Sequence, residues 1–263
     1  MAVTYLDDIV AFHRARVARD SRDWRQRLEA VRHTGPSLTD ALTADPATVA
    51  VIGEVKRRSP SQGWIAEDLV PAELALAYER GGARAVSVLT DAEFFAGSPT
   101  DLRQVRENVA VPVLQKDFTL SANDVVDAAV LGAAVLLIVA ALSDDELALF
   151  MDVARQCAID SLVEVHDTVE ARRALDVGAR VIGVNQRDLR TFGVDETRAV
   201  AVIATLPGDV VAVAESGLRT VTDVQRVADA GYDAILVGET LVRASDPVEL
   251  VRQFASVRRT SRA

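Results

Sequence analysis

The chain contains very little cysteine and few aromatic residues. Cys157 is the single cysteine among 263 residues, so neither an intrachain disulfide framework nor a cysteine-based zinc site can form. This usage fits a reducing compartment, and Cys157 lies in an apolar helical pattern that predicts a place in the core. Aromatic residues make up 5% of the chain, whereas 49% of its residues are hydrophobic. A large core must therefore be built mainly from Ala, Val, Leu and Ile.

The sequence also lacks a long basic block, a membrane-length apolar run and a secretory signal. Its formal net charge is −10, and a surface for nucleic acid or an anionic membrane would need a basic stripe. The longest apolar run, residues 128–142, is too short to span a bilayer. The acidic first residues show no basic region followed by an apolar run. We expect a cytoplasmic protein without nucleic-acid or membrane partners, as a monomer or a weak homodimer.

Short buried strands alternate with helices from residue 49 onward. Most of the apolar runs lack polar alternation, as expected for parallel strands that are covered on both faces. The runs that we predict as strands are residues 49–55, 85–90, 111–115, 134–140, 161–165, 181–185, 210–214 and 234–237. The helical patterns between them include residues 71–80, 121–131, 144–157 and 221–230. This alternation is typical of βαβ units and a parallel sheet.

A repeated junction indicates that the sheet closes into a barrel. A helix, a glycine and a short buried strand follow one another at Gly82, Gly132, Gly178 and Gly231. Each glycine is placed to adopt the left-handed conformation that ends a helix. Four such two-strand units close naturally into eight, so we predict a (β/α)8 TIM barrel of the α/β class. The alternative is an open doubly wound sheet, which would more often carry a Gly-x-Gly-x-x-Gly turn after its first strand.

The first 48 residues do not follow this alternation. Residues 9–31 form an Arg-rich amphipathic helical pattern. We interpret residues 1–48 as an N-terminal helical extension packed against a barrel of residues 49–263, with the whole chain as a single domain. Its length would also permit two small domains. His13 and His33 lie in the extension, and we expect both at the surface.

Charged and amide side chains stand at the carboxyl ends of several strands, where catalysis takes place in this kind of barrel. Side chains two apart on a strand share a face, so Glu54 with Lys56, and Asn185 with Arg187, can point into the mouth. A solvated rim of ion pairs explains any one pair equally well. It explains the whole set poorly, because burying such groups is costly unless they are paired or used.

Lysine is rare, and its two positions are informative. Only two of the 29 basic residues are lysine: Lys56 ends the first predicted strand and Lys116 ends the third. Arginine does not readily give up its proton, whereas the pKa of a partly buried lysine can be lowered into a working range. The two lysines therefore indicate proton transfer or carbonyl polarisation.

Glycines after the last two strands indicate a phosphate site. Ser216-Gly217 and Gly238-Glu239 occupy positions where these barrels commonly bind phosphate through backbone N–H groups and the start of a short helix. Glycine lets the backbone come close to the anion. Each glycine alone could be a loop residue, but their joint position favours a phosphorylated small-molecule substrate.

Aromatic residues and one further histidine give weaker signals. Phe94, Phe95 and Phe118 lie near strand ends, where they could form walls for a planar substrate or pack in the core or in a lid. His166 shares a strand face with Glu164 and could orient a neighbour. No pair of histidines has metal-ligand spacing, so we expect no metal.

Seven motifs resemble those of the indole-3-glycerol phosphate synthase family. They are Glu54-Val-Lys56-Arg-Arg-Ser59-Pro-Ser61-x-Gly63, Phe95-x-Gly97-Ser98, Leu114-Gln-Lys116-Asp-Phe118, Leu162-Val-Glu164-Val-His166, Ile182-Gly-Val-Asn185-x-Arg187-Asp-Leu189, Ala214-Glu215-Ser216-Gly217 and Leu236-Val-Gly238-Glu239. The resemblance covers essentially the whole chain in the expected order, including the helical extension. The first and third motifs are quite specific for this family among phosphate-binding barrels.

The resemblance implies an activity and a set of catalytic residues. The family converts 1-(2-carboxyphenylamino)-1-deoxyribulose 5-phosphate to indole-3-glycerol phosphate in tryptophan synthesis, with loss of carbon dioxide and water. By this resemblance, Lys116 is the general acid toward the substrate ketone, and Glu164 and Lys56 serve the loss of the hydroxyl group. Glu54 orients Lys56, and Asn185 holds the intermediate. Positioned acid and base groups replace any cofactor.

The same resemblance implies the residues that bind the substrate. Ser59 and Arg187 engage the anthranilate carboxylate, and Glu215 contacts the sugar hydroxyls. The remaining residues flank the aromatic ring or the phosphate: Phe95, Phe118, Ser216, Gly217, Gly238 and Glu239. Gln115 and Gln186 depart from the usual family pattern, but both alternate away from the catalytic face, so we expect little effect on chemistry.

Two other functions stay open. A sugar-phosphate isomerase such as phosphoribosylanthranilate isomerase uses the same barrel, but it needs a cysteine or aspartate acid–base pair at the mouth. Here the first strand ends in Glu54-x-Lys56, and Cys157 lies elsewhere. A non-catalytic barrel that acts as a partner or regulatory subunit would have no need of both lysines.

Overall fold

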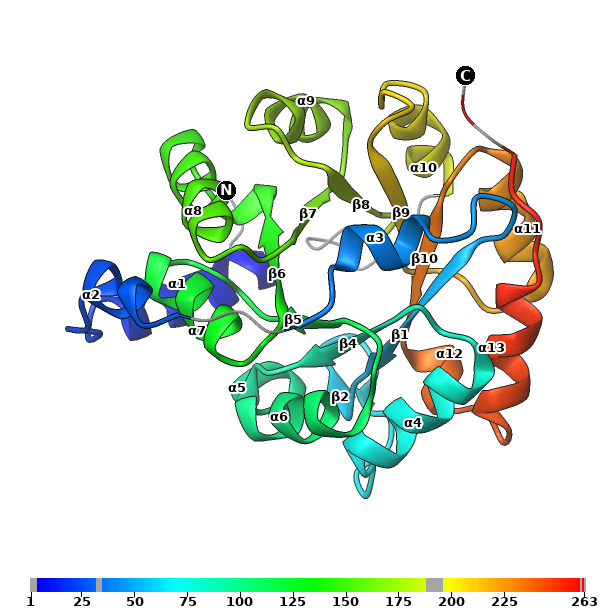
Figure 1. The fold of residues 1–263 in the computed structure, drawn as a ribbon, viewed down its shortest axis with the longest axis horizontal. Helices are drawn as coiled ribbons and strands as arrows, with labels where there is room; N and C mark the ends of the chain where they lie inside the picture. Colours follow the sequence, from blue (N-terminus) through cyan, green and yellow to red (C-terminus); the bar gives the residue numbers. More distant parts are fainter. Residues whose placement is uncertain (1–3, 32–34, 188–195, 261, 263) are drawn as a thin grey trace.

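Parallel strands form a closed ring in this computed structural model, which describes residues 4–31, 35–187, 196–260 and 262. Eight strands in that part of the chain pair in the order β1-β10-β9-β8-β7-β6-β5-β4 (Figure 1). Their bounds are β1 Ala50–Val55, β4 Ala85–Leu89, β5 Val113–Lys116, β6 Ala134–Ile138, β7 Ser161–Val165, β8 Val181–Asn185, β9 Val211–Glu215 and β10 Ala234–Val237. The predicted (β/α)8 barrel is confirmed.

Helices surround this ring on the outside. They are α4 Pro71–Gly81, α5 Ala92–Phe95, α6 Pro99–Asn108, α7 Ala122–Val130, α8 Asp144–Gln156, α9 Thr168–Asp176, α10 Glu196–Ile203, α11 Val221–Asp229, α12 Glu239–Val242 and α13 Pro247–Ala255, with a short 3-10 turn, η1 Val139–Ala141. Local sequence sets their starts. Ser121, Ser143 and Thr220 each form a capping box with an acidic residue three positions on, which satisfies N–H groups that a helix start leaves free.

The strand boundaries follow the apolar runs to within two residues. The two largest differences are the end of β6, at Ile138 rather than at residue 140, and the start of β5, at Val113 rather than at residue 111. At β5 the reason is that Pro112 has no N–H to donate to the sheet. The four predicted junction glycines all have positive φ, between 70° at Gly132 and 97° at Gly82. They end helices in the left-handed conformation, as the repeat predicts.

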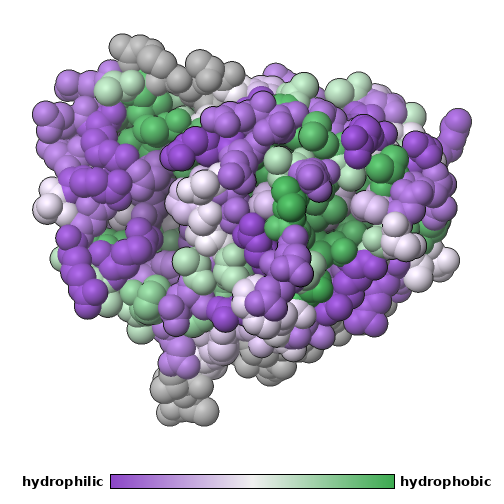
Figure 2. All heavy atoms as spheres, turned by 90° about the horizontal axis from the view of Figure 1, so that it is seen from below, coloured by the Kyte–Doolittle hydropathy of each residue, from purple (hydrophilic) through white to green (hydrophobic). Residues whose placement is uncertain are grey.

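The core is built mainly from aliphatic strand residues, and the large side chains lie between the barrel and its helices. Tyr78, Tyr232 and Phe254 are fully buried. Cys157 is buried as well, which confirms the expectation for it. Hydrophilic side chains cover most of the face in Figure 2, where hydrophobic ones gather in separate patches. Within the described ranges, no helix has the length and apolar character needed to cross a membrane.

The N-terminal region differs from the single helix predicted over residues 9–31. It forms α1 Tyr5–Val17 and α2 Trp24–Glu29, followed by α3 Leu38–Thr43. The prediction was wrong at the break before Trp24, where Asp23 caps α2 through Arg25 N. Short polar side chains of this kind compete with the helix for backbone hydrogen bonds.

The three N-terminal helices reach both ends of the barrel. In Figure 1, α3 crosses the centre of the ring, and it contacts β1, β4 and β9. Ser37 and Thr39, at its start, bind Asp160 just before β7, so α3 covers the amino-terminal end of the strands. Helix α1 lies at the opposite end, where Leu6 and Ile9 line the mouth.

The expectation that His13 lies at the surface was wrong. Its side chain is only 6% exposed, and it contacts Asp91 just after β4. Leu6, Ile9 and His13 form the buried face of α1, and that spacing of three and four residues is typical of the packed side of a helix. His33 lies outside the described residues.

Candidate active site

A cavity of about 470 Å³ opens at the carboxyl ends of the strands. Its walls include all fourteen predicted site residues: Glu54, Lys56, Ser59, Phe95, Lys116, Phe118, Glu164, Asn185, Arg187, Glu215, Ser216, Gly217, Gly238 and Glu239. Most stand on the last residue of a strand or in the loop that follows it, so closure of the barrel brings them together.

The centre of the cavity holds one lysine between two carboxyl groups. Lys116 Nζ lies 2.6 Å from Glu164 Oε2 and 3.4 Å from Glu215 Oε2. The side chains of both glutamates are nearly inaccessible to solvent, and that of Lys116 is 13% exposed. A buried cluster of this kind has strongly coupled charges, because little water screens them.

These charges shift the pKa of every member of the cluster. Burial alone would lower the pKa of Lys116, but Glu164 and Glu215 outweigh it and raise that pKa above its ordinary value. Burial opposes ionisation of Glu164, yet Lys116 and His166 hold its pKa below the ordinary value. Burial and the nearby Glu164 charge raise the pKa of Glu215 to about 8. At neutral pH the cluster therefore holds an ammonium, a carboxylate and a carboxylic acid.

This corrects the expectation that burial lowers the pKa of the lysine at the end of β5. Lys116 has more negative charge around it than the sequence alone indicates, because β7 and β9 both direct a glutamate at it. Lys116 is therefore held as a hydrogen-bond donor, and it can release its proton only to a group that becomes strongly basic.

The second lysine forms a pair of its own. Lys56 Nζ donates to Glu54 Oε1, and both side chains are largely buried. Gly238 lies against this pair: a Cβ there would meet Glu54 Oε1 and would come within 3.1 Å of Lys56 Nζ. The glycine therefore gives the Glu54–Lys56 pair its space, whether or not it also approaches an anion.

Asn185 and His166 both contact Glu164. Asn185 Nδ2 donates to Glu164 Oε1 over 3.1 Å, while Asn185 Oδ1 accepts from Ser216 Oγ over 2.8 Å. His166 Nε2 lies 3.7 Å from Glu164 Oε1, and His166 Nδ1 lies 3.0 Å from Glu170 Oε2. Both contacts reach Oε1 of Glu164, whereas Lys116 contacts Oε2, so each oxygen of the carboxylate has a partner.

One side of the mouth is aromatic. The rings of Phe95 and Phe118 are 6.5 Å apart and tilted by 36°. Ser59, on the short hairpin of β2 Arg58–Ser59 and β3 Gly63–Trp64, is buried in the cavity wall. Its Oγ has no hydrogen-bond partner among the described residues. A buried hydroxyl of this kind is available to a ligand.

The opposite side of the mouth carries consecutive residues with positive φ. Ser216 has φ 69° and Gly217 has φ 76°, and the short helix α12 begins just after Gly238. Ser216 is held in this unusual conformation for a non-glycine residue by Gln186, whose Nε2 donates to its carbonyl over 3.0 Å. Neither Gln186 nor Gln115 lines the cavity, which confirms that both side chains point away from it.

Several lining residues were not identified from the sequence. Tyr5, Leu6 and Ile9 come from α1, and Arg219 and Arg243 stand beside the turn after β9 and the helix α12. The arginines have no periodic pattern that distinguishes them from the other arginines of the chain. Their charge offsets the acidic cluster at the centre, so the cavity can accept an anion at this side.

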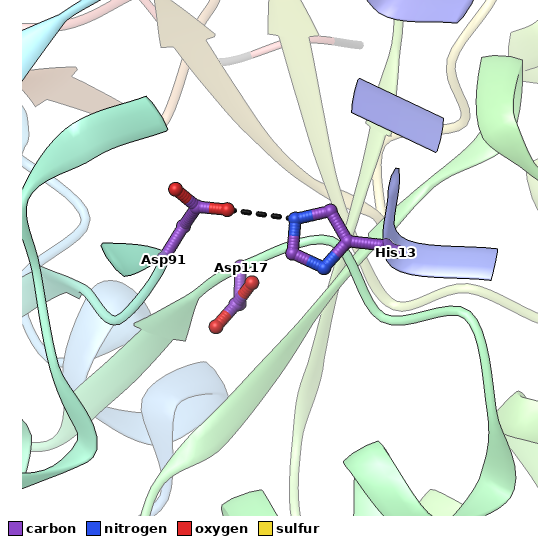
Figure 3. A group of neighbouring side chains, drawn as sticks. All are labelled: His13, Asp91 and Asp117. Carbon is purple, nitrogen blue, oxygen red and sulfur yellow. Dashed lines mark hydrogen bonds and ion pairs between the residues drawn. The ribbon is translucent and has the colours of Figure 1, made fainter. Parts of the chain in front are cut away.

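A second group of ionisable side chains lies at the edge of the cavity. One possible ligand atom from each of His13, Asp91 and Asp117 lies within 4.8 Å of the others (Figure 3). The carboxylates already accept hydrogen bonds. Asp91 Oδ1 accepts from Phe94 N and Phe95 N, and Asp117 accepts from Phe118 N and Thr90 Oγ1.

Comparisons with known proteins match one enzyme family over most of the chain. The family model described as indole-3-glycerol phosphate synthase matches residues 6–254. The chain is 48% identical over 243 residues to the indole-3-glycerol phosphate synthase of Micrococcus luteus, which covers 90% of this chain and 91% of that protein. It is 44% identical over 259 residues to the protein of that name from Rhodococcus jostii, covering 97% and 96%.

Among solved structures, thiamine phosphate pyrophosphorylase from Pyrococcus furiosus matches with a TM-score of 0.59 at 16% identity, covering 83% of this chain and 96% of that one. A match at this identity reflects the shared barrel fold alone. The family model and the two long sequence matches carry more information than the fold, because they extend through the strand ends that form the cavity. The chain belongs to the indole-3-glycerol phosphate synthase family.

Proposed function

We propose that Lys116, Glu164 and Lys56 divide the steps of the family reaction among themselves. The chain is a carboxy-lyase of tryptophan biosynthesis. Its reaction joins the ring carbon that bears the carboxylate to the ketone carbon of the sugar chain, and carbon dioxide and water then leave. The observation that carries our assignment is the Lys116–Glu164 contact of 2.6 Å between the aromatic side and the phosphate side of one cavity.

Lys116 serves ring closure. Its ammonium donates a hydrogen bond to the ketone oxygen, which draws electrons from the carbonyl carbon. The ring carbon attacks, a C–C bond forms, and the oxygen takes the proton of Lys116 as negative charge develops there. Loss of carbon dioxide then returns the electron pair to the ring. The raised pKa of Lys116 suits this step, because an alkoxide is basic enough to take the proton and a ketone is not.

Glu164 and Lys56 serve the loss of water. The hydroxyl group leaves with a proton from an acid, and a base removes a proton from the neighbouring carbon to form the indole double bond. The lowered pKa of Glu164 keeps it ionised, which suits the base. Lys56, oriented by Glu54, supplies the proton. Asn185 donates a hydrogen bond to the Glu164 carboxylate, and from this position beside the base it also holds the intermediate.

The two anionic ends of the substrate occupy opposite sides of the cavity. Ser59 and Arg187 engage the anthranilate carboxylate, and Phe95 and Phe118 flank its ring. The phosphate lies against the backbone of Ser216, Gly217, Gly238 and Glu239, with Arg219 and Arg243 nearby. Glu215 contacts the sugar hydroxyls. The acid and base groups suffice for the steps above, so the proposal includes no cofactor.

Indole formation tests the activity on which this division of steps rests. Purified protein is mixed with 1-(2-carboxyphenylamino)-1-deoxyribulose 5-phosphate, and the rise of indole fluorescence is recorded. A Lys116→Met variant, purified in the same way, shows whether a contaminating host enzyme causes the signal. We expect turnover with the native chain alone. The absence of a signal at any enzyme concentration would exclude the synthase activity and would favour an isomerase or a non-catalytic barrel.

A further inference from the structure

His13 connects the N-terminal helix α1 to Phe95 and Phe118, which form the two aromatic walls of the cavity. Its Nε2 lies 2.7 Å from Asp91 Oδ2, and its ring stacks on Phe118 at 5.4 Å with an angle of 25°. In Figure 3 the imidazole and the Asp91 carboxylate point toward each other, with Asp117 beside them. A carboxylate oxygen only accepts, so Nε2 is the donor of this bond.

Asp91 links His13 to Phe95, the first of these walls. Its other oxygen, Oδ1, accepts from Phe94 N over 2.5 Å and from Phe95 N over 3.1 Å. These bonds cap α5, the four-residue helix that carries Phe95. The position of Phe95 therefore depends on the orientation of Asp91, whose side chain is 1% exposed. A buried carboxylate needs its partners, because losing one leaves an unsatisfied charge.

Phe118 forms the second wall, and His13 contacts it directly. Its backbone N–H donates to Asp117 Oδ1 over 2.8 Å, which holds the main chain, while the stacked imidazole restrains the ring. Stacked aromatic pairs gain energy beyond the area that they bury. One side chain thus supports Phe95 through a hydrogen bond and Phe118 through stacking.

A cation at His13, Asp91 and Asp117 is the competing interpretation of this cluster. The backbone N–H groups of Phe94, Phe95 and Phe118 already use an oxygen of each carboxylate, and His13 uses the second oxygen of Asp91. A metal would have to replace the His13–Asp91 bond. The hydrogen-bonded network accounts for the cluster without that loss.

We propose that His13 is a positioning residue that fixes the spacing of Phe95 and Phe118 and so sets the affinity for the aromatic ring of the substrate. This rests on the proposed function, which places both phenylalanines against that ring. His13 reaches no reacting atom. Its loss weakens binding at the aromatic end and leaves the phosphate end unchanged.

Two variants separate the two contacts of His13. His13→Phe keeps an aromatic ring against Phe118 and loses the donor to Asp91; His13→Gln keeps a donor and loses the ring. Arg16→Gln is the matched control, because Arg16 binds Asp124 in two places and also ties α1 to the barrel, but it contacts neither wall. Melting temperatures are compared first, so that only variants that fold as the native chain does are used.

The binding readout uses a substrate analogue in which the ketone is reduced to an alcohol, so that it cannot cyclise. We expect its Kd to rise roughly three- to tenfold in His13→Phe, in line with the loss of one hydrogen bond. KM should rise in parallel, with kcat changed less than about twofold. Competitive inhibition by inorganic phosphate should stay as in the native chain, since phosphate binds the other side.

Three results would overturn the proposal: an unchanged Kd in both His13 variants, an equal rise in Arg16→Gln, or an equal weakening of phosphate inhibition. The last two would mean that His13 merely holds the helix or the mouth as a whole. Failure of the proposed function looks different, because the native chain itself would then form no indole. If the native chain forms indole and the His13 variants bind the analogue with an unchanged Kd, only this inference is contradicted.

Discussion

Lys116 Nζ lies 2.6 Å from Glu164 Oε2, although β6 stands between the strands that carry them. The contact crosses the barrel mouth rather than following the sheet. It places an ammonium and a carboxylate, both ionised at neutral pH, within one hydrogen bond of each other, between the aromatic side and the phosphate side of the cavity. Each charge stabilises the other, so Lys116 is protonated and Glu164 is ionised before any substrate binds.

Replacing Lys116 by arginine keeps the positive charge and removes proton donation. We expect Lys116→Arg to lower kcat by about 10²–10⁴-fold, the usual contribution of a positioned general acid. The guanidinium stays protonated even beside a developing alkoxide. Indole fluorescence measures the rate, and circular dichroism with a thermal melt checks the fold. A rate near that of the native chain would remove Lys116 from the acid role.

Stability should depend on pH through Glu215. Its pKa is raised to about 8 in the folded chain, whereas a carboxyl group in an unfolded chain has an ordinary pKa of about 4.3. The unfolded state thus releases this proton first, and native stability is lost as the pH rises through that interval. The neutral variant Glu215→Gln should gain stability over the native chain between pH 5 and pH 9, and little below.

Urea unfolding at about pH 5, 7 and 9 measures this difference, and each kcal/mol should also appear as roughly 2–4 °C in the melting temperature. Glu107→Gln, at an exposed position, is the control for removing a carboxyl group from the surface. A stability difference for Glu215→Gln that is the same at all three pH values would contradict the raised pKa.

The barrel and its mouth could be predicted because both depend on local patterns. Apolar runs mark strands that are covered on both faces, and the residue at the end of such a run points to a known end of the barrel. Lys56, Lys116, Glu164 and Asn185 were found in this way, and all of them line the cavity. The family motifs then supplied roles that position alone does not.

What the sequence did not reveal depends on contacts between distant segments. His13 and Asp91 are 78 positions apart, and no local pattern pairs them. The spacing of His13 with Leu6 and Ile9 was the one available signal, since it places the imidazole on the apolar face of α1. The direction of the pKa shift at Lys116 was likewise hidden, because it depends on how many carboxylates the closed barrel directs at the amine.

Gly183 gives Glu215 its space on the neighbouring strand. A Cβ at this position would meet Glu215 Oε1 and would lie 2.7 Å from Leu162 Cδ2. We expect Gly183→Ala to displace the Glu215 carboxyl group, with a stability loss of about 1–3 kcal/mol from overpacking. A displaced group in the cavity should lower kcat/KM by about 10²-fold.

Gly178→Ala is the matched control for this effect. Gly178 has φ 78°, and a Cβ added there would have no described atom within 4 Å. Alanine at this position therefore strains the backbone by about 1–2 kcal/mol without touching the cavity. Stability should fall in both variants, and kcat/KM in Gly183→Ala alone. Equal kcat/KM values in the two variants would show that Glu215 tolerates displacement.

His166 should control the acidic limb of the pH–rate profile. Burial lowers the pKa of His166, but Glu170, Glu164 and Glu215 outweigh that and raise it, so the imidazole keeps its positive charge to higher pH than a free histidine does. That charge helps to keep Glu164 ionised. Without it the pKa of Glu164 rises, and the base is lost at a higher pH.

His166→Gln removes this charge, and we expect the acidic limb of kcat/KM to move to higher pH by roughly one unit. Glu170→Gln, which removes the largest favourable contact of the imidazolium, should move the same limb in the same direction by a smaller amount. An acidic limb that stays fixed in both variants would mean that Glu164 does not act as the base whose ionisation limits the rate.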